Sequence, residues 1–158
     1  MKTYYRHTFV LLFSMILIAN GCSRKPETLA DNFDEKKMEL AITEARSTFD
    51  EFLIRFNNPQ AGDEDFYVKV RVEDSHGVEH FWVGDLKLDS EPYSGTIGND
   101  PGVVKKVKLG EKYIFSRNEI SDWMYISNGK MQGNYTLRVE LESMSPKEAQ
   151  EIKRKFGW

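Results

Sequence analysis

The chain has 158 residues, of which 40% are hydrophobic and 30% are charged. This balance excludes an intrinsically disordered chain and favours one globular domain that can fold without disulfides or metal. The formal net charge is −3, and the only basic cluster is the short run at residues 104–108. We therefore expect no nucleic-acid partner, because phosphate backbones select basic surfaces.

The first 21 residues have the organisation of a secretory signal. Lys2 and Arg6 precede an apolar run over residues 9–19. A membrane-spanning helix needs about 20 apolar residues, so this run is too short to cross a bilayer as a helix. A positive start, a short apolar centre and small residues after it predict a signal peptide over residues 1–21.

The only cysteine, Cys22, stands directly after this signal. An exported protein gains little from one unpaired thiol, whereas a lipid anchor explains both its number and its position. Gly21 and Cys22 after an apolar run resemble a bacterial lipobox, although Ala19 occupies the place that usually holds leucine. We expect Cys22 to carry the lipid, palmitate included, that attaches the chain to the membrane.

The expected location is the cell envelope, with the anchored chain facing the periplasm. Ser23 after the lipidated cysteine resembles an outer-membrane sorting signal. The alternative is ordinary cleavage after residues 19–21, which would leave a soluble periplasmic protein. Residues 22–32 then form a lipidated tether, and residues 33–158 form a single domain.

A long helix is expected to begin at Asn32 or Asp34 and to end at residues 57–59. Asparagine and aspartate are common helix caps, and proline after asparagine stops a helix. The apolar positions recur in steps of three and four along one stripe. These positions are Met38, Ala41, Ile42, Ala45, Phe49, Phe52, Leu53 and Phe56.

The period then changes to two, which predicts strands. The first strand covers residues 66–72, and a turn at residues 74–77 leads to a second strand over residues 78–88. Phe81 and Val83 differ in parity from Leu86 and Leu88, which predicts a bulge at residues 84–85. Four more strands are expected at residues 93–98, 112–115, 120–127 and 135–141.

Two further helical segments are expected. Residues 103–106 could form a short helical piece after a turn. Ser145, Pro146 and Glu148 form a capping box with proline at the first helical position, and the helix should run to Lys155 or Phe156. The predicted fold is α+β: a bent antiparallel sheet or half-barrel with a long N-terminal helix and a C-terminal helix.

Four stretches resemble the bacterial YegJ-like family, known as domain of unknown function 2314. They are "EARSTFDEFLIRF", "AGDEDFYVKVRVEDSHGVEHFWVGDL", "SGTIGNDP" and "EISDWMYISNGKMQGNYTLR", and together they cover about residues 37–140. The resemblance implies a small bacterial α+β domain, often cytosolic and sometimes behind an export signal. It implies no activity and no catalytic or binding residues, and the last helix lies outside it.

No motif in the sequence specifies a catalytic reaction, a cofactor or a metal. Residues 73–80 gather acidic side chains and two histidines around a turn, which is more typical of a solvated turn than of a metal site. The remaining enzymatic hypothesis is a hydrolase or a metal-dependent enzyme that uses His80, Asp122 and Arg138.

The strand pattern instead predicts a surface for binding. If Phe81 and Ile120 lie in the core, alternation sends a polar and aromatic set to the other face. This set comprises His80, Trp82, Trp123, Tyr125, Thr136 and Arg138. Tryptophan, tyrosine and arginine are typical of recognition surfaces, and the alternative is that a helix covers this face.

The expected function is therefore a non-catalytic binding or accessory module of the envelope, in which His80, Trp82, Trp123, Tyr125 and Arg138 bind an unknown protein or a small ligand. A periplasmic immunity or inhibitor protein that captures a toxin is the first alternative. The enzyme that uses His80, Asp122 and Arg138 is the second.

Overall fold

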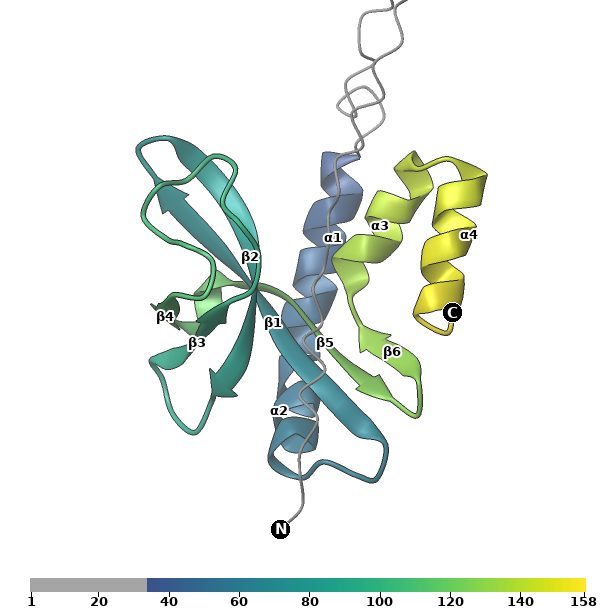
Figure 1. The fold of residues 1–158 in the computed structure, drawn as a ribbon, viewed down its shortest axis with the longest axis horizontal. Coiled ribbons are helices and arrows are strands. Elements are labelled where there is room, and N and C mark those ends of the chain that lie inside the picture. Colours follow the sequence, from purple (N-terminus) through teal and green to yellow (C-terminus); the bar gives the residue numbers. More distant parts are fainter. Residues whose placement is uncertain (1–33) are drawn as a thin grey trace, which may run out of the picture.

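The computed structural model describes residues 34–158, so the predicted signal peptide, Cys22 and the tether lie outside the described residues. The described part is an α+β domain, as predicted, and it contains four α-helices (Figure 1). The helices are α1 (Glu35–Ser47), α2 (Phe49–Asn57), α3 (Tyr135–Ser143) and α4 (Pro146–Lys155), and a 3-10 turn, η2, covers Arg117–Glu119. The strands are β1 (Asp63–Asp74), β2 (Gly77–Lys87), β3 (Tyr93–Ile97), β4 (Lys112–Phe115), β5 (Ile120–Ser127) and β6 (Lys130–Gly133).

These six strands form one antiparallel sheet in the order β4-β3-β2-β1-β5-β6. The sheet is bent and not closed, since β2, β3 and β4 turn away from β5 and β6 (Figure 1). The β6 edge is covered by the C-terminal residues: the Met131 amide donates to the Phe156 carbonyl at 3.0 Å, and the Trp158 indole donates to the Met131 carbonyl at 3.1 Å.

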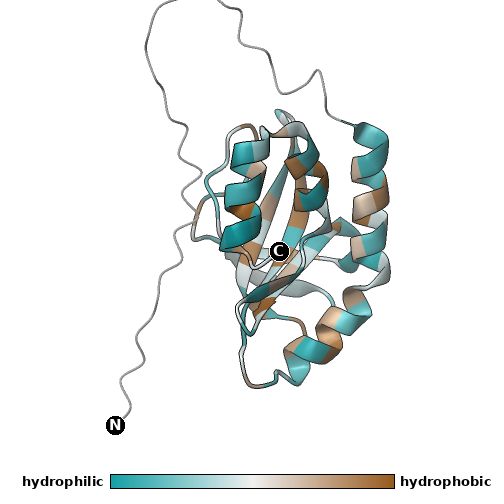
Figure 2. Ribbon diagram, turned by 90° about the vertical axis from the view of Figure 1, so that its right-hand side faces the viewer, coloured by the Kyte–Doolittle hydropathy of each residue, from teal (hydrophilic) through white to brown (hydrophobic). Residues whose placement is uncertain are grey.

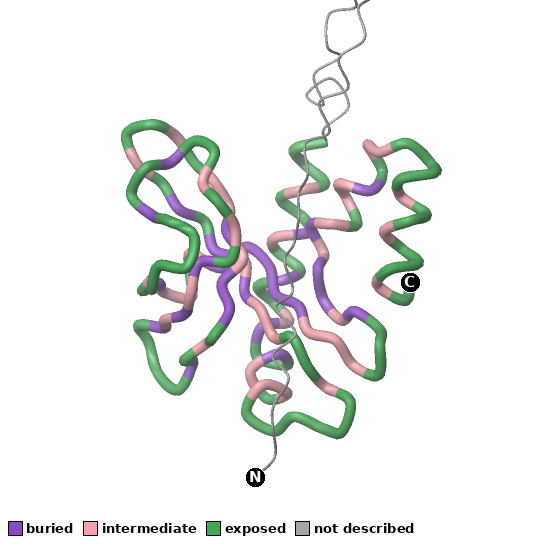
Figure 3. Tube along the Cα trace, viewed as in Figure 1, coloured by how far each residue is buried: buried purple, intermediate pink, exposed green. Residues whose placement is uncertain are grey.

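The core lies between one face of the sheet and helices α1 and α2. Phe49 and Phe52 of α2 are fully buried against Val68 and Phe81 of the sheet. Apolar residues are concentrated on the central strands in Figure 2. In Figure 3 the buried residues follow the middle of the sheet, whereas the turns at its ends are exposed.

The single helix predicted before the first strand is divided at Thr48 into α1 and α2. The Trp123 indole donates to the Ala45 carbonyl at 2.9 Å, the acceptor that a continuous helix would offer to the amide of Phe49. The Thr48 hydroxyl donates to the Glu44 carbonyl at 2.9 Å. Side chains that compete for backbone groups in this way break or bend helices.

The bulge predicted in the second strand is confirmed. The pairing of β2 with β3 shifts in register between Gly84 and Lys87, and Asp85 adopts a left-handed φ of 46°. The extra residue turns Leu88 inward, where it is buried beside the rest of the core. The capping box of the last helix is also confirmed, because Ser145 and Glu148 cap the start of α4.

Two predicted elements are wrong. Residues 135–141 form helix α3 and not a strand, because the buried carboxylate of Asp122 caps the helix from β5. Residues 103–106 form no helix, because the carboxylates of Glu79 and Asp74 accept the backbone amides there and hold them in an irregular loop. Strand β6 was not predicted.

Candidate binding site on the polar face of the sheet

The two faces of the sheet differ sharply in chemistry. Along β1, Val68 and Val70 point to the helices and are fully buried. Lys69 and Arg71 alternate with them and point to the opposite side. We call the first side the helix face. The second side is the polar face, which consists of Lys69, Arg71, His80, Trp82 and Asp122.

The structure separates the residues that were predicted to share one binding face. Trp82 pairs with Lys69 in the β1–β2 register, so it lies on the polar face. Trp123 pairs with Val68, so it lies on the helix face. Trp123 is only 5% exposed and packs on Phe52, with 5.3 Å between the ring centroids. The prediction of one common aromatic face is therefore wrong.

The error has a local cause in β5. The β1–β5 pairing shifts in register between Lys69 and Val70, which face Asp122 and Ile120 respectively. Ser121 is the extra residue of this bulge, and a bulge reverses the parity of every residue beyond it. Ile120 and Trp123 therefore both point to the helix face, although alternation alone would separate them.

Tyr125 follows Trp123 to the helix face. Its ring stacks on Phe66 at 5.0 Å and on Trp123 at 6.1 Å between centroids. The guanidinium carbon of Arg55 lies 5.8 Å from the Tyr125 ring centroid. Tyr125 is thus part of an aromatic cluster below α2 and not a neighbour of Trp82.

Arg138 lies on α3 and is exposed. Its guanidinium donates to the Gly133 carbonyl at 3.1 Å and lies over the rings of Tyr135 and Trp158, at 5.1 and 5.4 Å. The indole below Arg138 is that of Trp158, and it belongs to neither tryptophan of the predicted face. Together with Leu141, Glu142, Lys153 and Trp158 it lines a separate cavity of about 430 Å³.

Asp122 is fully buried and caps α3. Its carboxylate accepts the Thr136 amide at 2.8 Å, the Thr136 hydroxyl at 2.7 Å and the Tyr135 amide at 3.2 Å. Asn134, which precedes the helix, makes no side-chain cap of its own. Burial raises the pKa of Asp122, and hydrogen bonds from Thr136 act in the opposite direction. Asp122 thus replaces a local N-cap from a distant strand.

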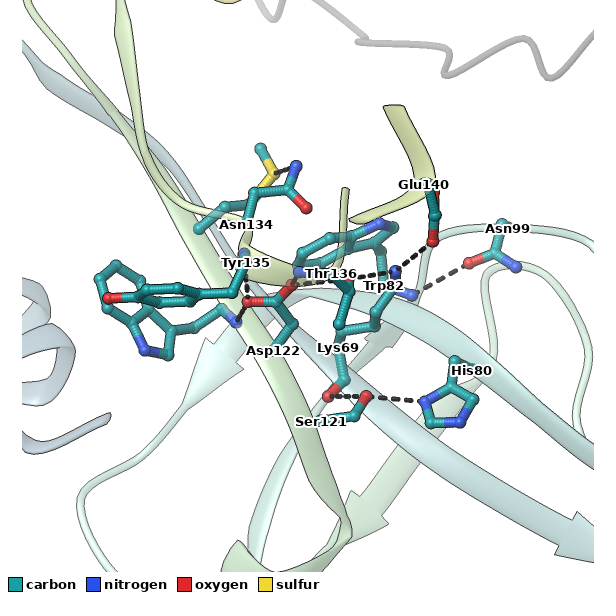
Figure 4. A network of polar contacts seen from close by, with 12 residues as sticks. Lys69, His80, Trp82, Asn99, Ser121, Asp122, Asn134, Tyr135, Thr136 and Glu140 are labelled. Carbon is teal, nitrogen blue, oxygen red and sulfur yellow. Dashed lines mark hydrogen bonds and ion pairs between the residues drawn. The ribbon is translucent and has the colours of Figure 1, made fainter. Parts of the chain in front are cut away.

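Lys69 lies at the centre of the polar face (Figure 4). Its ammonium group donates to the Thr136 hydroxyl at 2.9 Å and lies 3.5 Å from a carboxylate oxygen of Glu140. It also lies 5.2 Å from the centre of the Trp82 ring. The Lys69 side chain is only 14% exposed, and this partial burial strengthens both the ion pair and the cation–π contact.

Trp82 is half-buried, and its backbone amide donates to the Asn99 side chain at 3.0 Å. This bond ties β2 to the loop that follows β3. Asn99 thus binds the backbone of Trp82, and the ammonium group of Lys69 covers one face of its ring. The indole has a fixed position and retains exposed area, as an anchor for a partner requires.

His80 lies beside this pair and contacts the bulge residue of β5. Its Nδ1 is 2.7 Å from the Ser121 hydroxyl, which donates to the Lys69 carbonyl at 3.2 Å. We therefore assign the proton to His80 Nδ1, which leaves Nε2 as a hydrogen-bond acceptor. Burial first, and then the charges of Lys69 and Arg71, lower the pKa of His80 to about 4. His80 is thus neutral at pH 7.

The three residues of the enzymatic hypothesis do not form one constellation. His80 contacts Ser121, Asp122 caps α3, and Arg138 contacts Gly133. A catalytic histidine is normally oriented by a carboxylate, and the hydrogen bonds of Asp122 go to backbone and hydroxyl groups instead. These separate contacts do not link the three side chains into a proton relay.

The acidic turn at residues 73–80 has a structural role. Glu79 and Asp74 accept backbone amides of the loop between β3 and β4. Within residues 34–158, no group of three or more histidine, cysteine or acidic side chains could hold a metal ion. The same residues contain no helix that is long and apolar enough to cross a membrane.

Sequence reasoning missed the importance of Lys69 and Glu140. Lys69 lies inside the predicted strand at residues 66–72, with no special role predicted for it. Glu140 lies in residues 135–141, which the pattern predicts as a strand and which form part of α3. The available signal was the apolar alternation of residues 66–72, which isolates Lys69 and Arg71 between buried valines. Nothing local in the sequence links Glu140 to Lys69.

The fold and the polar face define a class: a small α+β domain whose bent antiparallel sheet carries α1 and α2 on one face. The other face carries a charged, aromatic network that α3 joins through Thr136 and Glu140. The chain belongs to the family described as "Uncharacterized protein conserved in bacteria (DUF2314)", whose model matches residues 35–158. The predicted family resemblance is confirmed, and the match extends through α4, beyond the predicted range.

Two relatives are similar to this chain. "Uncharacterized protein YegJ" of Escherichia coli (strain K12) is 33% identical over 149 residues, which cover 93% of this chain and 96% of the relative. "Putative ankyrin repeat protein NMB1133/NMB1171" of Neisseria meningitidis serogroup B (strain ATCC BAA-335 / MC58) is 32% identical over 85 residues, which cover 54% of this chain and 34% of the relative. No solved structure matches the chain significantly.

Proposed function

We propose that this chain is a lipid-anchored binding module of the bacterial cell envelope, attached through Cys22, that captures a partner on the polar face without a catalytic step. The anchor part rests on the sequence, in which one cysteine directly follows an apolar run. The alignment with the Escherichia coli relative spans 149 residues, more than residues 34–158 contain, so that similarity extends into the N-terminal segment. This extension supports a shared leader.

The half-buried indole of Trp82 carries the binding part of the proposal. Lys69 and Asn99 hold it from two sides, so that little conformational freedom is lost when a partner covers it. Around it, Arg71 and Glu140 remain partly exposed and His80 offers Nε2 as an acceptor. A rigid aromatic anchor with polar groups at its rim suits a protein segment with an apolar edge.

The proposal is tested by affinity capture from a detergent-solubilised envelope. The bait is the chain that begins at Cys22, and Trp82→Ala is compared with wild type by quantitative mass spectrometry. Trp158→Ala is the matched control, since Trp158 is 37% exposed and contacts Arg138 and Met131, whereas Lys69 lies over Trp82. We expect the captured partner to disappear with Trp82→Ala and to persist with Trp158→Ala.

Equal capture by all three baits contradicts a site at Trp82. A partner that is a toxin and loses activity when bound would make the chain an immunity protein. If an activity of the chain itself is found and is abolished by His80→Asn, the enzymatic alternative replaces the proposal.

The anchor is tested separately. Cys22→Ser should move the protein from the membrane to the soluble periplasmic fraction and abolish labelling by radioactive palmitate. If the wild-type protein is already soluble and unlabelled, cleavage follows residues 19–21 and Cys22 carries no lipid.

A further inference from the structure

A basic loop joins β3 to β4. Within it, Lys105, Lys106 and Lys108 are exposed, and so are the apolar side chains of Val103 and Leu109, at 47% and 52%. Val78, at the start of β2, adds another 42% exposed apolar side chain at the hairpin tip. Lysines that surround exposed aliphatic groups are typical of surfaces that rest on lipid headgroups.

The basic loop is held in a fixed shape. The carboxylate of Glu79 accepts the amides of Gly102 and Val103 at 2.8 and 2.9 Å, and that of Asp74 accepts the amides of Lys105 and Lys106 at 2.6 and 3.1 Å. Val104 and Val107 are buried and fix the loop from below.

Both acidic and basic side chains lie around the basic loop, and they differ in what their charged groups face. Asp74 and Glu79 turn their carboxylates toward the backbone amides of the loop, and these hydrogen bonds lower the pKa of Asp74 to about 2. His76, Asp100 and Glu111 are exposed nearby, and the Glu111 carboxylate accepts the backbone amide of Lys108 at 3.0 Å. The three ammonium groups carry the exposed positive charge of the loop.

The position of the basic loop in the domain indicates which surface the loop can reach. The hairpin tip and the loop lie at the end of the domain where α1 begins, and both views agree on this (Figures 1 and 2). About a dozen residues separate Cys22 from Asp34, the cap of α1. A chain of that length reaches at most roughly 40 Å when extended, so an anchor at Cys22 keeps this end near the membrane.

We propose that the basic loop docks on an anionic phospholipid surface, with Lys105, Lys106 and Lys108 at the headgroups and Val103 and Leu109 at the interface. This inference rests on the proposed anchor at Cys22 for its biological setting. The anchor supplies the high local concentration, and the loop determines which end of the domain meets the membrane.

The test uses the chain that begins at Cys22, which includes every residue that the structure describes. Cys22 is its only thiol, so a maleimide phospholipid in a vesicle attaches the chain at the proposed position whether or not cells lipidate it. Acetylation rates of individual lysines are then measured by mass spectrometry on vesicles with phosphatidylglycerol and on vesicles of phosphatidylcholine alone.

We expect acetylation of Lys105, Lys106 and Lys108 to slow about fivefold on the anionic vesicles and to recover in high salt, which screens the attraction. Lys87 and Lys130, both exposed and remote from the loop, are the controls and should react equally on both vesicles. The acetylation rate of Lys37, near the start of α1, measures the protection that proximity to the anchor alone produces.

Acetylation of the three loop lysines that is not slowed on either vesicle overturns the proposal. Equal protection on both vesicles also overturns it, because proximity and not anionic charge would then be the cause. Neither result depends on palmitate labelling in cells, so a failed anchor and a failed loop contact give different outcomes.

Discussion

The two faces of the sheet use aromatic residues in opposite ways. On the helix face, Trp123 is surrounded by rings and donates its indole N–H to the Ala45 carbonyl, so it is both packed and hydrogen-bonded. On the polar face, Trp82 is covered by one lysine and retains exposed area. The same residue type thus stabilises the fold on one side and is available for recognition on the other.

This difference shows that residue type alone does not define a binding surface. Trp82 and Trp123 both lie in central strands of the sheet, and each has at least one apolar neighbour in its strand. What separates them is the bulge at Ser121, which turns Trp123 toward α1 and α2. Substitutions on the two faces should therefore have different consequences, which the following experiments measure.

The largest effect is expected on the helix face. Trp123→Ala removes a ring that is 5% exposed and contacts Phe52, Tyr125 and Tyr135. We expect the free energy of unfolding to fall by about 3–5 kcal/mol, as for other buried aromatic truncations. Chemical denaturation measures this value. A loss below about 1 kcal/mol would contradict the placement of Trp123 in the core.

The second-largest effect is expected at Asp122, a residue of β5 whose carboxylate caps α3. Asp122→Ala leaves the amides of Tyr135 and Thr136 without their acceptor in a buried position. We expect a loss of about 2–3 kcal/mol, since a cap and buried donors are lost together. Asp122→Asn keeps one acceptor oxygen and should lose less. Circular dichroism and denaturation of both variants check this order.

The pH dependence should report His80. The pKa of His80 in the folded chain is about 4, below its usual 6.5, so the unfolded chain binds the proton first as pH falls. Stability should therefore decrease between pH 6.5 and 4, by about 1–2 kcal/mol once solvent screening of the partly exposed ring is allowed for. The decrease is absent above pH 6.5.

The control for this pH effect is His80→Asn, which can still hydrogen-bond Ser121 but does not titrate. The slopes of the two curves of stability against pH should differ only between pH 6.5 and 4. Parallel curves over this range would mean that His80 is not shielded from water in the folded chain.

The smallest effect is expected for Trp82→Ala. This change removes a cation–π contact with Lys69 and a half-buried ring, so the loss of stability should be about 1 kcal/mol. Thermal unfolding next to Trp123→Ala measures the contrast directly. Equal losses for the two tryptophans would mean that both faces are core, and the polar face would then offer no anchor.

Several elements could be predicted from the sequence because their signals are local. The stripe from Met38 to Phe56 produces α1 and α2, and Ser145 with Glu148 starts α4. The parity change after Val83 correctly predicted the bulge in β2, because apolar side chains on both sides of a bulge must reach the same core.

The site was less predictable because its parts meet only in the folded chain. The bulge at Ser121 leaves no parity signal, since Asp122 is buried as a cap and Trp123 as core. Lys69 meets Glu140 and Thr136 across long sequence separations. Trp82 could be placed correctly on the polar face, and its partner Lys69 could not be identified.

The sequence by itself determined the periodic elements, their caps and the alternation of valine with charge along β1, because these depend on neighbours in the chain. Only the tertiary structure decided that residues 135–143 are helical, because their cap, Asp122, comes from another strand. The same holds for the division of the first helix, where the indole of Trp123 takes a backbone acceptor. Long-range hydrogen bonds to backbone groups override local preference wherever they satisfy buried donors and acceptors that the local chain leaves open.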